Sequence, residues 1–148
     1  MEPSEVLSLA IRKEIEAREL YANVAERTDN PAARTLLCEL AKEEANHRRL
    51  LEGLSPEHVA AFKPPRAGQD LKIAEYLEAT PLGPESSLQE VVTHAMKREE
   101  QARDFYQAMA AATENRQLRK LLERLATMET AHKVRLETFY DDVFLREN

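Results

Sequence analysis

The sequence predicts an all-α fold, a four-helix bundle built from two helix-pair repeats and a long crossover connection. Composition gives the first indication, because only 3 of the 148 residues are glycine and 5% are aromatic. Such a composition, rich in good helix formers, disfavours a sandwich or barrel. Apolar residues also recur at helical spacing over four long segments. Finally, the sequence matches itself at a fixed offset. At this length we expect a single domain, residues 1–148.

The first helix pair is expected over residues 4–54. Ser4 is a suitable N-cap for a first helix that runs to about Thr28. Pro31 then stands at the first position of the second helix, where the missing backbone N–H costs nothing. The second helix carries a heptad-like leucine seam that ends near Leu54, as is typical of bundle packing.

The crossover connection is expected over residues 55–86, because prolines and glycines are concentrated there and interrupt any long helix. Short helical pieces are predicted at Ser55–Phe62 and Asp70–Glu78.

The second helix pair is expected over residues 87–140. Its first helix begins near Ser87, and a turn at 113–115 leads to the last helix. Residues 141–148 are predicted to fray as a tail.

The internal repeat indicates chemistry as well as structure. Shifting the chain by 85 positions aligns residues 11–52 with 96–137 without a gap, and sixteen of these 42 pairs are identical. A repeat that served only the core would keep apolar positions. This one also keeps three polar residues on the apolar stripe: Glu14, Glu44 and His47 align with Glu99, Glu129 and His132.

These six residues predict a metal site. Residues three apart on a helix share a face, so each Glu-x-x-His pair presents a carboxylate and an imidazole to one point. Four buried carboxylates need compensating charge. Two divalent ions supply it, and carboxylate and imidazole ligands suit iron, manganese or zinc.

Two other interpretations of the stripe are a solvent-facing surface and a buried ion-pair network. Leucines share the same faces, which disfavours the first. The second needs about four cations to balance the carboxylates, and on or near the stripes we find only Arg18 and Arg103. We therefore favour metal.

With these motifs in view, the sequence resembles the ferritin-like di-iron carboxylate proteins and, within them, the rubrerythrins. The resemblance covers about Leu9 to Tyr140 except the central connection. It rests on the six residues above and on two matching segments, Ala17-Arg18-Glu19-Leu20-Tyr21 and Ala102-Arg103-Asp104-Phe105-Tyr106. A Glu from two helices and Glu-x-x-His from the other two is the ligand pattern of such bundles.

The resemblance implies that Glu44 and Glu129 bridge two irons and that the other four residues are terminal ligands. It also implies that the second and third long helices run parallel. Peroxidase rubrerythrins carry a further ligating Glu where this sequence has Ala102, which weakens the expectation of peroxidase chemistry. The iron–sulfur module of rubrerythrins is not expected either, because Cys38 is the single cysteine.

Two tyrosines and two arginines lie near the predicted ligands. Tyr21 and Tyr106 follow the first-helix glutamates by seven residues, so they are candidate catalytic residues that hydrogen-bond a bridging carboxylate or pass a proton or electron; a core aromatic is the equal alternative. For Arg18 and Arg103 we expect a structural ion pair between helices.

The function predicted is reduction of peroxide or dioxygen at two iron ions, with electrons from a separate donor. The alternatives are iron handling without turnover and a metal-stabilised structural bundle. A net charge of −6 argues against nucleic acid as a partner, and no apolar run is long enough for a membrane span. We further expect a cytoplasmic homodimer, the first because the start lacks signal-peptide features, the second from the resemblance.

Overall fold

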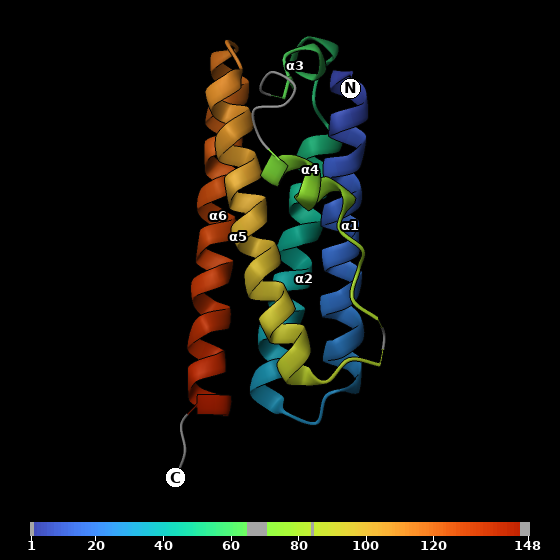
Figure 1. Ribbon diagram of the computed structural model, residues 1–148, viewed down its shortest axis with the longest axis vertical. Helices are drawn as coiled ribbons and strands as arrows, with labels where there is room; N and C mark the ends of the chain where they lie inside the picture. Colours follow the sequence, from blue (N-terminus) through green and yellow to red (C-terminus); the bar gives the residue numbers. More distant parts are fainter. Residues whose placement is uncertain (1, 65–70, 84, 146–148) are drawn as a thin grey trace.

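The computed structural model describes residues 2–64, 71–83 and 85–145. The main body of the described chain is an elongated bundle of long helices that lie side by side (Figure 1). They are α1 (Pro3–Arg27), α2 (Pro31–Glu52), α5 (Leu88–Ala112) and α6 (Arg116–Tyr140). α1 packs mainly on α2, and α5 mainly on α6. The predicted all-α bundle of two helix pairs is therefore confirmed.

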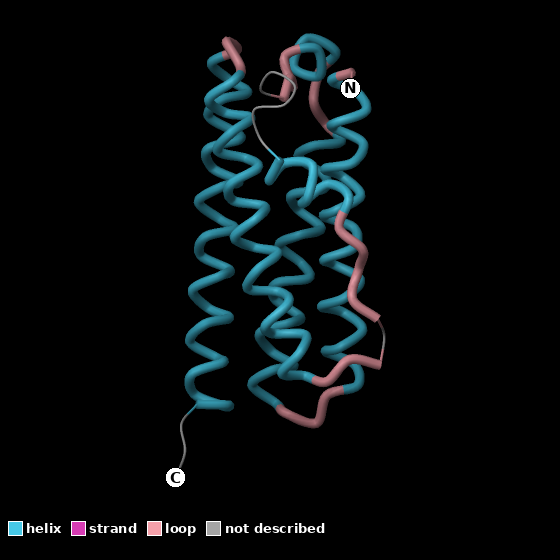
Figure 2. Tube along the Cα trace, viewed as in Figure 1, coloured by secondary structure: helices cyan, strands magenta, loops and turns pink. Residues whose placement is uncertain are grey.

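The connection between the pairs crosses the length of the bundle. The chain leaves α2 at one end and enters α5 at the other, so these two helices point in the same direction (Figure 1). α3 (Pro56–Ala60) and α4 (Leu71–Glu78) belong to this connection. After α4, the chain runs as a loop beside the bundle (Figure 2). Both short helices were expected, although α3 ends two residues earlier than predicted and Asp70 lies outside the described residues.

The turns within the two helix pairs are built alike, which explains part of the repeat. Asn30 caps α2 by accepting a hydrogen bond from the Ala33 N–H at 2.9 Å, and Asn115 caps α6 by accepting one from the Leu118 N–H at 2.9 Å. One turn further on, two aligned arginines donate back across each turn. They are Arg34 to the Thr28 carbonyl and Arg119 to the Thr113 carbonyl.

Both ends of the bundle differ from the prediction. α1 begins at Pro3 with Glu2 as its N-cap, not Ser4. A proline is well suited to the first helical position, and the Glu2 N–H is satisfied by the Glu5 carboxylate.

At the other end, residues 141–145 do not fray but continue α6 as a turn of π-helix, η1 (Asp141–Leu145). Phe144 packs on the rings of Phe139 and Tyr140 with centroids 6.1 and 5.1 Å away, which holds this turn in place. Residues 146–148 lie outside the described part.

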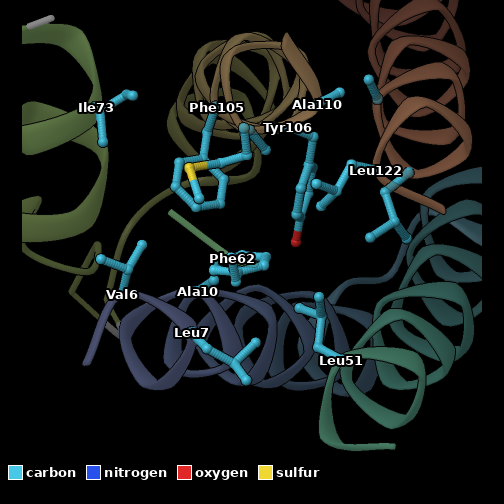
Figure 3. Close-up of a cluster of buried hydrophobic side chains, with 14 of the residues drawn as sticks. Val6, Leu7, Ala10, Leu51, Phe62, Ile73, Phe105, Tyr106, Ala110 and Leu122 are labelled. Atoms are coloured by element: carbon cyan, nitrogen blue, oxygen red, sulfur yellow. The ribbon is translucent and has the colours of Figure 1, made fainter. Parts of the chain in front are cut away.

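The core consists of two apolar clusters with a polar layer between them. One cluster gathers residues such as Leu7, Phe62 and Phe105 from α1, α5 and the crossover (Figure 3). The other includes Leu37 and Phe139 at the opposite end of the bundle. Along every long helix, the residues of the predicted metal site fall between the residues of the two clusters. The folding of the apolar clusters therefore positions the polar layer.

Candidate metal centre

The structure brings all six predicted ligands together in the polar layer. Each is 1% exposed or less, although four of them are carboxylic acids. Two come from α1 and α5, one each, and the other four come as pairs from α2 and α6. The pairs point inward because their three-residue spacing places both members on one helix face.

Their atoms form two overlapping groups that could each hold a metal ion. Glu14, Glu44, His47 and Glu129 form one group, and Glu44, Glu99, Glu129 and His132 form the other. Within each group, the four ligand atoms lie within 4.8 Å of one another. Glu44 and Glu129 belong to both groups. Two neighbouring ions would therefore share these two carboxylates, which is the bridging role that the family resemblance implies.

The first group converges on one nitrogen atom. His47 Nδ1 lies 3.0 Å from a Glu44 oxygen and 3.4 Å from oxygens of Glu14 and Glu129. None of these contacts has the alignment of a hydrogen bond, so within the described part of the chain the three oxygens and both ring nitrogens of His47 have no hydrogen-bond partner. Buried polar atoms without partners are costly and rare. Such a set of inward-facing oxygen and nitrogen donors fits a divalent transition metal.

The second group is better satisfied within the protein. His132 Nδ1 lies 3.1 Å from Glu99 Oε2 and 3.2 Å from Glu129 Oε1. Its other nitrogen, Nε2, donates to the Glu43 carboxylate at 2.9 Å, and Arg135 donates to the same carboxylate. Glu43 was not predicted. A carboxylate on the far nitrogen of a histidine fixes its tautomer and leaves the near nitrogen for a metal.

A buried cation that we did not predict lies among the carboxylates. One guanidinium nitrogen of Arg98 donates to Glu44, Glu99 and Glu129, and the other donates to Glu14 at 3.1 Å. The expectation that only Arg18 and Arg103 could supply positive charge here is therefore wrong. Arg98 directly precedes a ligand, but its side chain is long enough to turn inward.

We expected Arg18 and Arg103 to form ion pairs between helices, and the structure shows that this expectation is wrong. Arg103 pairs with its neighbour Asp104 on α5, and Arg18 is exposed without an ion pair among the described residues. A residue four after a ligand is turned only about 40° around the helix, so spacing alone did not show that neither arginine joins the carboxylate cluster.

Arg98 does not neutralise the layer by itself. Burial, together with the charges of neighbouring glutamates, raises the pKa of Glu129 well above its usual range and also raises the pKa of Glu44. Glu14 behaves differently: burial would raise its pKa, but Arg98 and His47 outweigh this effect and lower the pKa to about 2. The two carboxylates that both groups share are thus the least compensated.

The histidines take up protons in response. Burial alone would lower the pKa of His47, but the adjoining carboxylates raise it to about 10. The same balance raises the pKa of His132 to about 9. In the metal-free protein both imidazoles therefore carry a proton at neutral pH. Metal ions would replace these protons at the same donors, so the residues fit a metal pair.

The two predicted tyrosines bind carboxylates of the site across the bundle. Tyr21 on α1 donates to Glu99 on α5 at 2.9 Å, and Tyr106 on α5 donates to Glu14 on α1 at 2.7 Å. They contact the glutamates that were expected as terminal ligands, not the expected bridging ones. Spacing along one helix could not show this, because each hydroxyl crosses to the opposite helix pair.

A third tyrosine approaches the site from the crossover. Tyr76 on α4 is 1% exposed, and its hydroxyl accepts a hydrogen bond from Arg98 at 3.3 Å. Nothing in the repeat indicates Tyr76, because the connection has no counterpart in the second half. Ala102, at the position where peroxidase rubrerythrins carry another ligand, is fully buried on α5.

These features define a ferritin-like helical bundle with a buried cluster of carboxylates and histidines at its centre. The chain belongs to the rubrerythrin family, whose family model matches residues 5–82 and 90–148. No curated protein matches the chain.

Two solved structures share the fold. A hypothetical protein from Pyrococcus furiosus is 27% identical, with a TM-score of 0.71 over 95% of this chain and 89% of that one. A protein of Thermotoga maritima, described as a candidate ferritin-like diiron-carboxylate protein, is 21% identical, with a TM-score of 0.71 over 94% of both chains. Among the described residues, no helix combines the length and the apolar character that crossing a membrane requires.

Proposed function

We propose that this protein binds two iron ions between the six buried ligands and reduces peroxide or dioxygen with electrons from a separate donor. The observation that carries the proposal is the pair of overlapping ligand groups that share Glu44 and Glu129. A structural ion-pair network needs no such duplicated set. Manganese or zinc would fit the same donors.

A bound iron pair would supply the redox chemistry, and the chain itself supplies position, charge and protection from water. The apolar clusters cover the layer from both ends of the bundle, and the six ligands are 1% exposed or less. Tyr21 and Tyr106 hold Glu99 and Glu14 by hydrogen bonds. Each hydroxyl also keeps a proton close to the site, because burial and the adjacent carboxylates raise both tyrosine pKa values well above 10.

A second candidate function is iron binding or oxidation without catalytic turnover. The observation in its favour is Ala102, which cannot supply the additional carboxylate expected of a peroxidase. Glu100 does not replace it, because its side chain is 51% exposed and points away from the layer.

The partners we propose are a small oxidant, a separate electron donor and a second copy of the chain in a homodimer. The single cysteine of these 148 residues cannot build an iron–sulfur module within them. For this reason we propose a donor outside these residues, another protein or a small reductant.

Anaerobic loading with ferrous iron followed by addition of peroxide tests the proposal. We expect two irons per chain and repeated consumption of peroxide while a reductant is supplied. A single oxidation event without further turnover would favour the iron-handling alternative. Absence of bound iron, manganese and zinc would overturn the metal site itself.

A further inference from the structure

A cavity of about 440 Å³ lies beside the metal centre, between α1, α5 and the chain that follows α4. Tyr21, Tyr76 and Arg98 line it, and the same three residues contact the carboxylate cluster or one another there. Small-molecule sites commonly measure roughly 300–1,000 Å³, and a water molecule takes only about 30 Å³. The cavity is thus much larger than peroxide or dioxygen requires.

Cationic side chains outnumber carboxylates in the lining of the cavity, although the protein as a whole is acidic. Four cationic side chains line it, against two carboxylates. The cations are Lys13, Arg27, Lys97 and Arg98, and the carboxylates are Glu16 and Glu19. His94 lies on the same wall, and its pKa is lowered by burial and by the nearby charges of Arg98, Lys13 and Lys97. Lys13 pairs with Glu16, so an anion near α5 would be attracted mainly by Lys97 and by an Arg98 side chain that has left the glutamates.

Another part of the wall is aliphatic. Leu20 and Val24 on α1 and Leu82 after the crossover helix contribute to it, together with small alanines. A lining with cations in one region and aliphatic side chains in another suits an amphiphilic molecule, whose chain packs on the apolar wall while its charged group faces the cations.

Arg98 connects the cavity to the metal centre. Its guanidinium donates to one oxygen of each of the four glutamates, whereas the other oxygens of Glu14, Glu44 and Glu129 face His47 Nδ1. A guanidinium cannot lose its charge by deprotonation in a protein, so it would repel metal ions bound to the same carboxylates. Its side chain is 11% exposed and lines the cavity, which is the space into which it can turn.

We propose that this cavity binds an organic carboxylate with a short aliphatic chain, and that Arg98 anchors it once metal ions displace the guanidinium from the glutamates. The planar guanidinium matches a carboxylate through two parallel hydrogen bonds. This inference rests on the proposed metal site. It adds that the site works next to an organic ligand, whose binding depends on the metals.

The test compares binding of octanoate to the zinc-loaded and metal-free protein by isothermal titration calorimetry. Zinc is redox-inert, and its stoichiometry is measured first, so a failed metal site is recognised separately from a failed cavity site. We expect octanoate to bind the loaded protein about tenfold more tightly than the metal-free protein, the difference expected for one charge-assisted interaction. Octylammonium, of the same length and opposite charge, should not bind. Two bound zinc ions without octanoate binding would overturn the proposal, and so would equal affinity in both states.

Two variants separate the anchoring role from a structural one. Arg98→Gln should bind zinc more tightly, because the competing cation is gone, and should bind octanoate more weakly. A merely structural role would weaken both. Lys97→Gln, on the exposed side of the cavity, should weaken octanoate alone, while the matched Lys120→Gln on α6, outside the cavity lining, should change nothing. Unchanged octanoate affinity in both Arg98→Gln and Lys97→Gln would contradict the assignment.

Discussion

The two halves of the repeat supply identical ligands but surround them differently. α1 and α2 provide Glu14, Glu44 and His47, and α5 and α6 provide their counterparts at an offset of 85 positions. Each half also sends one tyrosine to the glutamate of the other. The halves diverge at residues adjacent to the ligands, where a duplicated sequence can change without losing the site.

One difference concerns the far side of the histidines. His132 donates through Nε2 to Glu43, whereas no residue that the structure describes forms a hydrogen bond with Nε2 of His47. The residue that aligns with Glu43 is Met128, whose thioether is at most a weak acceptor. Burial opposes ionisation of Glu43, but His132 and Arg135 lower its pKa. The Nε2 atom of His132 therefore faces an ionised carboxylate, and the Nε2 atom of His47 has no such partner among the described residues.

The other difference concerns the residue before the first-helix glutamate. Lys13 aligns with Arg98, but it turns away from the layer and donates to the Ala79 carbonyl at 2.6 Å and to Glu16. Arg98 turns inward and binds the glutamates. The six ligands are therefore symmetric between the two halves, whereas the charged residues next to them, Arg98 and Glu43, are not.

Removing the shared ligands should have the largest effect, because both halves depend on them. The double variant Glu44→Gln, Glu129→Gln is expected to lose both metal ions, as measured by metal analysis after loading and dialysis. The metal-free variant should melt at a higher temperature than the metal-free parent, because buried carboxylates with raised pKa values are removed.

Glu123→Gln, at an exposed position of α6, serves as the control and should retain two ions. Full metal content in the double variant would show that the two halves do not share these carboxylates.

The pH dependence of the metal-free protein should be the next largest effect. The pKa values of His47 and His132 are raised to about 10 and about 9. Groups with raised pKa values contribute stability that is fully present below the ordinary histidine value of about 6.5. This stability is lost as the pH rises through the folded-state values. The raised pKa values of Glu44 and Glu129 act in the same direction.

Thermal unfolding followed by circular dichroism between neutral pH and pH 10 measures this effect. The melting temperature should fall over that range without metal and fall much less with bound zinc, which replaces the protons. In His132→Gln only His47 remains, so the fall in melting temperature should shift to higher pH, towards the pKa of His47. A melting temperature that does not change over the range would contradict the protonated state of both imidazoles.

Glu43→Ala should affect one metal position more than the other. Removing the acceptor behind a metal-binding histidine typically costs about 10–100-fold in affinity. A zinc titration should show two binding steps. We expect Glu43→Ala to lower the zinc affinity of only one of them, the step in which zinc binds the group containing His132. Met128→Leu, at the aligned position, should leave both steps unchanged. Equal weakening of both steps by Glu43→Ala would mean that the asymmetry around the histidines has no effect on the metals.

The tyrosines should give the smallest and most symmetric effect. Tyr21→Phe and Tyr106→Phe each remove one hydrogen bond to a carboxylate, worth roughly 1–3 kcal/mol where the acceptor is charged. The metal-free protein also loses this hydrogen bond, so only part of the lost free energy lowers the zinc affinity. We expect a several-fold decrease in zinc affinity that is similar for the two variants. A large difference between them would show that the cross-bundle pair is not equivalent.

Much of the fold could be predicted because its determinants are local. Each determinant affects only residues close to it in the sequence. Examples are the helical spacing of apolar residues, the asparagine caps before α2 and α6, and the prolines of the crossover. The N-cap of α1 was missed by two residues, since Pro3 at the first helical position makes Glu2 the cap and not Ser4. The turn after α6 was missed because the ring contacts of Phe144 depend on the packed helix beneath it.

The six candidate ligands could be found because the repeat marks them twice. Arg98, Glu43 and Tyr76 could not, because each occurs once and acts across the bundle. Arg98 aligns with a lysine that turns the other way, and Glu43 aligns with a methionine. Only the packing of helices distant in sequence determines which of these side chains reach the polar layer.

The most direct measurement is the anomalous diffraction of crystals loaded anaerobically with iron. The account predicts two iron peaks within the polar layer, both next to Glu44 and Glu129, one beside His47 Nδ1 and the other beside His132 Nδ1. A layer without iron, with Arg98 still bound to all four glutamates, would contradict it and leave the cluster as a buried ion-pair network.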